Sequence, residues 1–368
     1  MGKMFSSRFL QKLVSPARYA SGSYIRGWRR RARLAPFTVV LVYHRVTADG
    51  ESSRGRFLIE AGTPASVFES QIRFMLRYFA PIKASQALES SSQPLRFAVT
   101  FDDGYEDNFR VAAPILRRLG IPATFFVVSD YAGTDRVFWW DRLADMMRTT
   151  RALAIDPGAV PPPVAGADAV RLPLHTFAER ARAYERVSAL LRNGPHAALA
   201  ERMDRLADAL GVSAREQGGN YALMDWSQLK ELVRQGFEIG SHTATHCNVV
   251  GGDPAFLRTE IITSVRSIES RVGAPVLSFA YPYGHHDGND GVADLLREAG
   301  CRVAFEGTKG VAQAGLDSFA LPRVPVNRRF HFACAYSIQD ALNHSRPGGC
   351  QTALHQPVRQ QAATARQK

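Results

Sequence analysis

Acidic residues are missing from both ends of this chain, although the 368-residue sequence contains 34 of them. The first is Asp49, and none follows Asn343. The basic residues of these two ends account for the formal net charge of +12, so the body between them is close to neutral. A protein that binds nucleic acid electrostatically carries its positive charge on the folded surface. The sequence also has no zinc-finger, RRM or helix-turn-helix pattern, and we expect no nucleic-acid partner.

Cysteine is scarce, and its spacing excludes two classes of site. The sequence has 4 cysteines, at 247, 301, 334 and 350, and no two of them form a CxxC pair. This pattern fits neither a disulfide framework nor a zinc cluster. We therefore expect reduced thiols in a cytoplasmic protein.

Long hydrophobic runs are also missing, which leaves no candidate for a signal peptide or a membrane-spanning helix. We predict that residues 1–36 form a basic N-terminal arm. Its apolar residues Phe5, Phe9, Leu10 and Leu13 lie near helical spacing among basic residues. Two interpretations stay open, a helix lying on anionic lipid and a disordered arm. If the arm is a helix lying on lipid, we expect the protein to contact the inner face of the membrane peripherally.

From residue 37 onward, short apolar runs alternate with amphipathic segments, which predicts a parallel sheet or barrel with helices outside. Four helical segments end at or just before a glycine that a strand follows, as expected for repeated α/β units. We expect strands near 38–43, 97–101, 123–129, 237–241, 277–281 and 302–305. The predicted barrel occupies 37–133 and 225–330, and a C-terminal helix and basic tail occupy 331–368.

The segment 134–224 interrupts this alternation and predicts a helical insertion. A Pro/Gly/Ala-rich stretch is followed by two charged amphipathic helices. Trp139 and Trp140 near its start could form a sugar-stacking lip, but packing of the insertion onto the barrel is the favoured interpretation.

Two adjacent acids, Asp102 and Asp103, follow the apolar run of residues 97–101 directly. Reactive groups of α/β barrels lie at the carboxyl ends of the strands, where this pair is predicted to sit. Capping of the following helix is the alternative role.

Two histidines four residues apart, His242 and His246, follow the predicted strand at 237–241. On one helical turn this spacing directs both rings to the same side, which suits a single metal ion. A chance HxxxH on a surface helix is the alternative. With one carboxylate, two histidines form a catalytic rather than a structural ligand set, because positions stay open for water and substrate.

A third strand end carries Tyr281-Pro282-Tyr283-Gly284, a rigid turn that could present backbone N–H groups to an oxyanion. Taken alone, this is only a loop motif.

Together these three segments resemble the motifs of polysaccharide deacetylases with the NodB homology domain, carbohydrate esterase family 4. The resemblance covers about residues 38–330 without the insertion, and it implies a distorted (β/α) barrel. It further implies that Asp103, His242 and His246 bind one divalent metal ion, and that Asp102 is the general base. Zinc is the default, with nickel, cobalt or iron as alternatives.

Two departures from the family's pattern concern the third motif and the general acid. The family's third-motif arginine is Ala280 here; Arg323 could supply the charge, or could be an exposed structural residue. The family's late Leu-x-His segment has a weak match at Leu342-Asn343-His344. His44 ends the first predicted strand and resembles the acid histidine of permuted members, so we assign the acid role to His44 over a packed structural role.

The expected function is therefore metal-dependent removal of N-acetyl groups from amino sugars of a glycan. In this mechanism the backbone N–H of Tyr283 helps to hold the oxyanion. Two alternatives are a non-catalytic glycan-binding protein on the same barrel and a membrane-surface interaction protein.

Overall fold

The structure is a computed structural model that describes residues 18–51, 62–156, 171–192, 196–212, 221–284, 291–326 and 331–345, the last range with side chains from residue 334 onward. The four apolar residues of the N-terminal arm, at 5, 9, 10 and 13, and the cysteine at 350 lie outside the described residues, so neither interpretation of this segment is tested.

Seven parallel strands close into a barrel because β1 pairs with β13 on one side and with β5 on the other. Their order around the ring is β1-β13-β11-β10-β9-β6-β5. The strands are β1 (Phe37–Tyr43), β5 (Leu95–Phe101), β6 (Thr124–Val127), β9 (Glu238–Ser241), β10 (Ser278–Ala280), β11 (Val303–Lys309) and β13 (Leu321–Pro325). The predicted barrel of (β/α) type is confirmed.

Six further short strands complete the sheet structure. β4 (Ala80–Ile82) extends the sheet beside β5, and β12 (Ala312–Gln313) runs antiparallel to β1. Two small sheets lie apart from the barrel and pair β2 (Val46–Thr47) with β3 (Thr63–Pro64) and β7 (Ala154–Ile155) with β8 (Leu172–Pro173).

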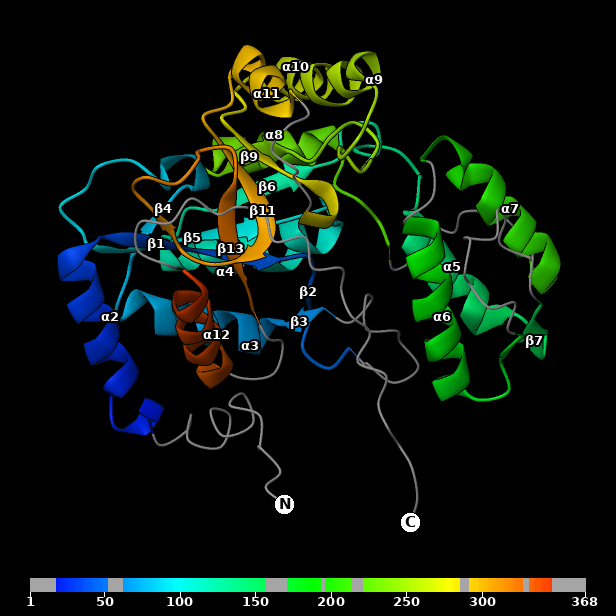
Figure 1. The fold of residues 1–368 in the computed structure, drawn as a ribbon, viewed down its shortest axis with the longest axis horizontal. Helices are drawn as coiled ribbons and strands as arrows, with labels where there is room; N and C mark the ends of the chain where they lie inside the picture. The colour runs from blue at the N-terminus through cyan, green and yellow to red at the C-terminus, as the bar shows by residue number, and fades with distance from the viewer. Residues whose placement is uncertain are drawn as a thin grey trace, which may run out of the picture.

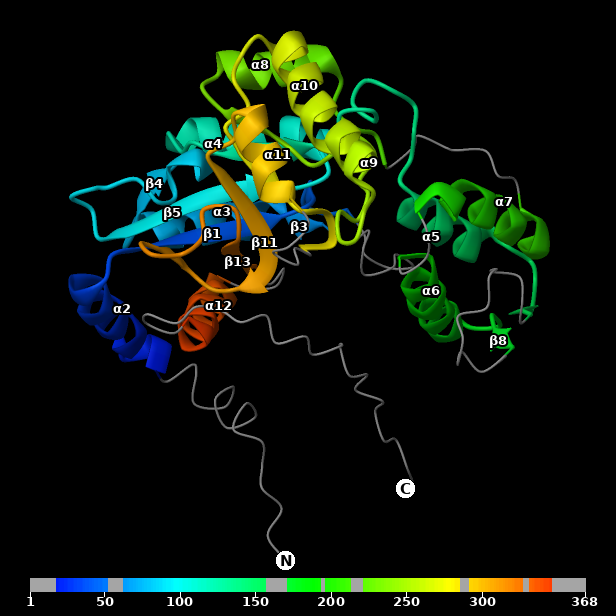
Figure 2. The same cartoon turned by 45° about the horizontal axis from the view of Figure 1, so that its top comes forward.

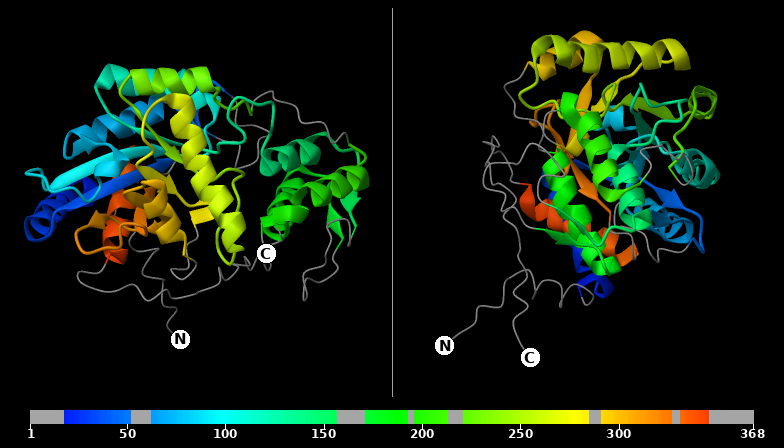
Figure 3. Two further views of the ribbon diagram at one scale, coloured as in Figure 1. Left: turned by 90° about the horizontal axis from the view of Figure 1, so that it is seen from above. Right: turned by 90° about the vertical axis from the view of Figure 1, so that its right-hand side faces the viewer.

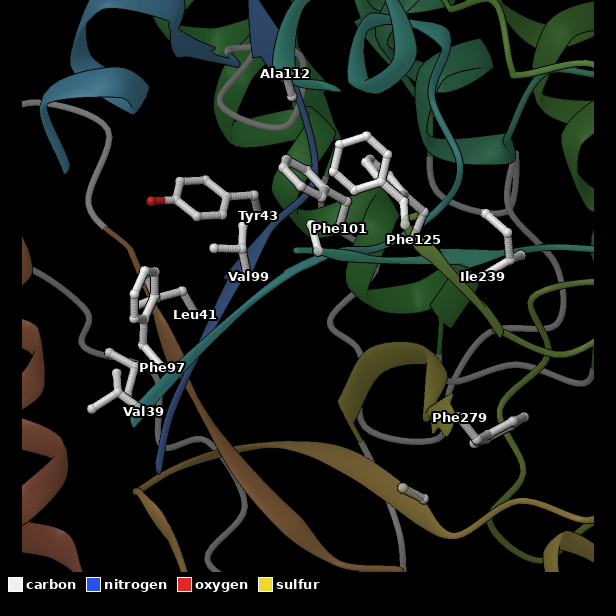
Figure 4. Packing of buried hydrophobic residues seen from close by; sticks show 14 of the residues in the cluster. Val39, Leu41, Tyr43, Phe97, Val99, Phe101, Ala112, Phe125, Ile239 and Phe279 are labelled. Atoms are coloured by element: carbon white, nitrogen blue, oxygen red, sulfur yellow. The ribbon is translucent and has the colours of Figure 1, made fainter. Parts of the chain in front are cut away.

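Alternation along the strands divides the core into two parts. Odd-numbered residues of β1 and β5, such as Leu41 and Phe101, pack in a large cluster between barrel and helices (Figure 4). There the rings of Phe101 and Phe125 stack with centroids 4.8 Å apart. Even-numbered residues such as Val40 and Ala98 belong to a smaller, separate cluster that fills the barrel. This parity continues past the end of β5 and directs Asp102 toward the barrel interior.

A polar layer closes the amino-terminal end of the barrel. Buried Glu238 accepts hydrogen bonds from the hydroxyls of Thr124 (3.0 Å), Ser278 (2.8 Å) and Ser85. Three hydroxyl donors satisfy a buried carboxylate that would otherwise be costly, so this layer has a structural role.

Helices cover the outside of the barrel, with α8, α10 and α11 on one side and α2 and α12 on another (Figures 1 and 2). They are α2 (Ser23–Leu34), α3 (Ala65–Leu76), α4 (Ala113–Leu119), α8 (Trp226–Arg234), α9 (Pro254–Arg258), α10 (Ser264–Val272), α11 (Val292–Ala299) and α12 (His331–His344). Short 3₁₀ turns span Ala84–Gln86, His196–Ala198 and Pro282–Gly284. The helical segments that end at Gly120 and Gly273 each contain a π-helical stretch, η2 (Asn108–Ala112) and η4 (Thr259–Thr263).

The predicted insertion forms a helical lobe beside the barrel, made of α5 (Trp139–Thr149), α6 (Phe177–Arg192) and α7 (Leu199–Leu210) (Figures 1 and 3). It has its own hydrophobic cluster, which also includes Tyr105 and contacts Tyr283 of the barrel. Trp139 and Trp140 are 8% and 6% exposed. Both therefore pack the lobe onto the barrel, as the favoured interpretation had it.

The described part of the predicted basic arm is a docked helix. Trp28 of α2 is buried against Phe74 and Phe79, and its indole N–H donates to Gln339 of α12 (3.2 Å). Arg31 donates to the backbone carbonyl of Ser345 (2.9 Å). Within the described residues, no helix is long and apolar enough to cross a membrane.

Candidate active site

Three buried side chains from two strand ends converge in a group that could hold a metal ion. Asp103 Oδ1 lies 3.6 Å from His242 Nε2 and 3.4 Å from His246 Nε2. Bonds of about 2.1 Å in tetrahedral geometry place two ligand atoms about 3.4 Å apart. These donor separations therefore fit one small divalent cation, and the structure brings together the three predicted metal ligands.

Strand parity explains which of the neighbouring side chains face the barrel axis. Asp102 continues the inward series of Ala98 and Thr100 on β5, and Arg323 continues that of Leu321 on β13. Parallel strands end at the same rim, so the two charged side chains meet there.

Asp102 and Arg323 form a buried bidentate ion pair. Arg323 Nη1 donates to Oδ1 (2.7 Å) and Nη2 to Oδ2 (2.8 Å), and both side chains are under 5% exposed. Burial raises the pKa of Asp102, but the charge and hydrogen bonds of Arg323, with smaller contributions from the charges of His242 and His44, together outweigh burial and hold this pKa well below its usual range. Arg323 thus occupies the charge-supplying role that the sequence left open, and the alternative of an exposed structural arginine is wrong.

His242 is set up as a neutral ligand. Its Nδ1 lies 2.7 Å from the backbone oxygen of Ala280, which can only accept, so Nδ1 carries the proton. The lone pair of Nε2 therefore faces Asp103. Burial lowers the pKa of His242 to about 4, which keeps the ring neutral near pH 7. Ala280, the departure in the third motif, contributes through its backbone carbonyl.

Strained backbone is concentrated at this rim. Within the described ranges, the four non-glycine residues with positive φ are Asp103 (75°), Thr243 (67°), His246 (60°) and Tyr283 (59°). Such conformations cost about 1–3 kcal/mol each and persist only where surrounding contacts enforce them. Every segment of the resemblance contributes at least one of these residues, which supports a functional origin of the strain.

The loop that carries His246 is anchored by Glu260, a residue that the sequence analysis missed. This buried carboxylate of η4 accepts the backbone N–H of Ala244 (3.0 Å) and Thr245 (2.9 Å) and the Thr245 hydroxyl (2.7 Å). His196 of the insertion contacts the same hydroxyl through Nε2 (2.8 Å). Glu260 comes 14 residues after His246 on an amphipathic helix, and nothing in that spacing distinguishes it from a surface residue.

Tyr283 of the third motif stands between barrel and insertion. Its hydroxyl accepts the indole N–H of Trp139 (3.1 Å), and the guanidinium of Arg192 lies 5.6 Å from its ring centroid. Burial raises the pKa of this phenol to about 12, so it stays protonated. The next residue, Gly284, packs directly on Gly307 of β11, which explains why the motif needs a glycine there.

His44 lies at the carboxyl end of β1, adjacent to the Asp pair. The Asp102 N–H donates to the carbonyl of Tyr43 (3.0 Å), and the His44 carbonyl accepts from Asn108 (2.9 Å). Its side chain is exposed, and its charge, when protonated, contributes to lowering the pKa of both aspartates. The weaker candidate, His344, is on the outer helix α12 and contacts the Asp340 carbonyl (2.6 Å).

A family model described as polysaccharide deacetylase matches residues 91–153 and 206–304. Over these ranges the barrel of this chain is similar to the polysaccharide deacetylase family. The matched ranges contain both aspartates, both metal-site histidines and Tyr283, whereas His44 and Arg323 lie outside them. The gap between the ranges falls within the insertion.

A known protein of similar sequence agrees with this similarity. The protein YxkH of Bacillus subtilis (strain 168), whose name assigns it to the polysaccharide deacetylases, is 31% identical over 100 residues. That match covers 26% of this chain and 33% of YxkH, so it spans about a third of the relative's length.

Two solved structures share the fold. The deacetylase PplD of Streptococcus pyogenes, solved with acetate, superposes with a TM-score of 0.53 at 15% identity, over 83% of this chain and 99% of PplD. IcaB from Ammonifex degensii gives a TM-score of 0.51 at 18% identity, over 82% and 97% of the two chains. At these identities the likeness shows a shared fold and no more.

Proposed function

We propose that this chain is a metal-dependent hydrolase that removes N-acetyl groups from amino sugars of a polysaccharide, oligosaccharide or lipid-linked glycan. The observation that carries the proposal is the buried Asp103, His242 and His246 triad directly beside the ionised Asp102. Similarity of the barrel to the polysaccharide deacetylase family supports the reaction class.

One divalent cation, zinc by default, would be held by Asp103, His242 and His246. When bound, it would polarise the acetyl carbonyl and lower the pKa of the attacking water toward about 7. Three protein ligands leave open positions, as catalytic sites require.

The remaining steps belong to side chains and backbone of this chain. Asp102, ionised and oriented by Arg323, accepts a proton from the attacking water. The backbone N–H of Tyr283 helps to hold the tetrahedral oxyanion, for which one such donor is typically worth about 3 kcal/mol. His44 protonates the sugar nitrogen as the C–N bond breaks, because an amine anion is too basic to leave.

Amine release from an N-acetylated glucosamine oligomer, with and without a chelator, tests the proposal. We expect turnover that the chelator abolishes and that added divalent metal restores. A folded His242→Ala/His246→Ala double variant should lose both metal and turnover. Stoichiometric metal in that variant, or turnover unaffected by the chelator, contradicts the proposed centre.

A non-catalytic glycan-binding protein on the same barrel is the competing function. It predicts glycan binding by the metal-loaded protein with no amine release, so the same assay separates the two. The ion-paired Asp102 argues against it, because a binding protein has no need of an oriented base.

For the N-terminal arm we propose a peripheral contact with anionic membrane on the cytoplasmic side. Four arginines of α2, at 26, 29, 30 and 33, are exposed on a helix whose opposite face is docked. Basic residues near anionic lipid contribute about 1 kcal/mol each. Co-sedimentation with phosphatidylglycerol vesicles, and not with phosphatidylcholine vesicles, is the expected result.

A further inference from the structure

The two metal-site histidines are oriented by different means. The His242 ring is fixed by its hydrogen bond to the Ala280 carbonyl (2.7 Å), the usual arrangement for a histidine ligand. His246 Nδ1 is buried and finds no hydrogen-bond partner among the described residues. Something other than a hydrogen bond must therefore fix this second ring.

Aromatic rings surround His246 instead. The Trp140 centroid lies 4.6 Å from the imidazole at 62°, and that of Phe138 lies 5.6 Å away at 61°. Tyr283 approaches from the barrel at 4.8 Å and 86°. All three contacts are edge-to-face, the arrangement that aromatic rings prefer, and each restricts rotation of the imidazole.

The two rings from the insertion are themselves held firmly. Phe138 stacks on Trp140 (4.4 Å, 10°) and on Tyr131 (4.7 Å, 13°). The Trp140 indole N–H donates to the hydroxyl of Tyr105 (2.9 Å), which donates in turn to Asp141 (2.6 Å). Tyr105 follows the Asp pair of the first motif, so this chain of contacts links the first and second motifs through the insertion.

We propose that Trp140 and Phe138 of the insertion are positioning residues that hold the His246 ring in its metal-binding orientation. The insertion thereby forms part of the metal site in addition to packing on the barrel. This inference rests on the proposed metal centre.

Metal affinity of chelator-stripped protein tests the inference, measured by zinc competition with a chromophoric chelator and by the visible spectrum of Co²⁺-loaded protein. Trp140→Leu should weaken zinc binding about 10- to 100-fold, as is usual when a ligand loses its support, and alter the Co²⁺ bands. Trp140→Phe keeps a ring beside His246 and should stay near wild type. Phe138→Leu removes the neighbouring contact independently, should Trp140→Leu fail to fold.

Leu143→Ala is the matched control, because Leu143 is fully buried in the same helix and belongs to the insertion's own cluster. It should lower Tm while leaving zinc affinity and the Co²⁺ spectrum unchanged. The inference is overturned if Leu143→Ala and Trp140→Leu lose zinc affinity equally. It is also overturned if both Trp140→Leu and Phe138→Leu keep wild-type zinc affinity. Either result leaves the proposed function standing. Absence of metal binding by the wild type contradicts the proposed function as well.

Discussion

At the residue scale, adjacent acids face different surroundings because of one backbone torsion. Asp102 continues the extended strand and points inward to Arg323, whereas Asp103 turns at φ 75° toward the two histidines. Neighbours in sequence thus acquire separate tasks.

Substitution of each acid by asparagine should separate these tasks. Asp102→Asn should retain metal and lose about 10²- to 10⁴-fold in kcat/KM, the usual contribution of a general base. Asp103→Asn should lose metal as well as turnover. Metal analysis and amine release on folded protein check both, and near wild-type turnover in Asp102→Asn would remove it from the base role.

Arg323 controls the ionisation of Asp102, which leads to a pH prediction. An adjacent cation lowers a carboxyl pKa by about 1–3 units. In Arg323→Met the pKa of Asp102 should rise, so the acid limb of the kcat/KM profile should move to higher pH by a similar amount. In Arg323→Lys, which keeps the positive charge, the acid limb should lie closer to its wild-type position than in Arg323→Met.

The same variant should also be less stable. Breaking a buried pair leaves an unpaired carboxylate and costs about 3–5 kcal/mol. Denaturant unfolding at pH 7 gives the loss directly. An unmoved acid limb in a folded Arg323→Met protein would show that another group sets the ionisation of the base.

His44 should act on the leaving group alone. His44→Ala should keep metal and fold, and lose about 10²- to 10⁴-fold on N-acetyl substrates. An acetate ester needs less protonation of its leaving group, so its hydrolysis should suffer less. Equal losses on amide and ester, or loss of metal, would assign His44 a different role.

At the scale of elements, strand ends made most of the site predictable. The apolar runs located β5, β9 and β10, and the rule that reactive groups follow parallel strands indicated the residues after them. The role of Arg323 stayed undecided because β13 was not predicted as a strand. Had it been, the alternation of its residues would have directed the Arg323 side chain inward.

Other contributions left no comparable signal. Glu260 acts from a π-helical segment, and the Ala280 carbonyl acts through the backbone, which no side-chain pattern records. The contacts of Phe138 and Trp140 with His246 depend on how the insertion docks, and sequence periodicity does not contain that information.

The turn of the third motif depends on a close backbone approach. Gly284 has φ +71°, and an added Cβ would lie 2.4 Å from Gly307 Cα. Gly284→Ala should therefore lower stability by about 1–3 kcal/mol beyond the cost of its φ. Gly120→Ala is the matched control, with φ +67° and nothing within 4 Å of the added Cβ. If denaturant unfolding shows the same loss of stability in Gly284→Ala and Gly120→Ala, the contact with Gly307 does not contribute to the cost.

At the scale of the whole molecule, barrel and insertion meet around the candidate metal site. Tyr283 and His246 from the barrel contact Trp139 and Trp140 from the insertion, and His196 reaches the loop anchored by Glu260. The site therefore depends on both lobes, and the ionisation of its buried side chains is linked to folding of the barrel and the insertion.

Stability of the metal-free protein should consequently depend on pH through His242. Its pKa is about 4 when folded and about 6.5 when unfolded, so between these values the unfolded state binds more protons. The contribution of His242 to the free energy of unfolding should then be fully present above pH 6.5. It should fall as the pH drops toward 4, by on the order of 3 kcal/mol. Urea unfolding in chelator across this range measures the fall, and His242→Gln should remove most of it. Parallel curves for wild type and variant would mean that His242 is not held neutral by burial, and that the site is more open to water than its packing indicates.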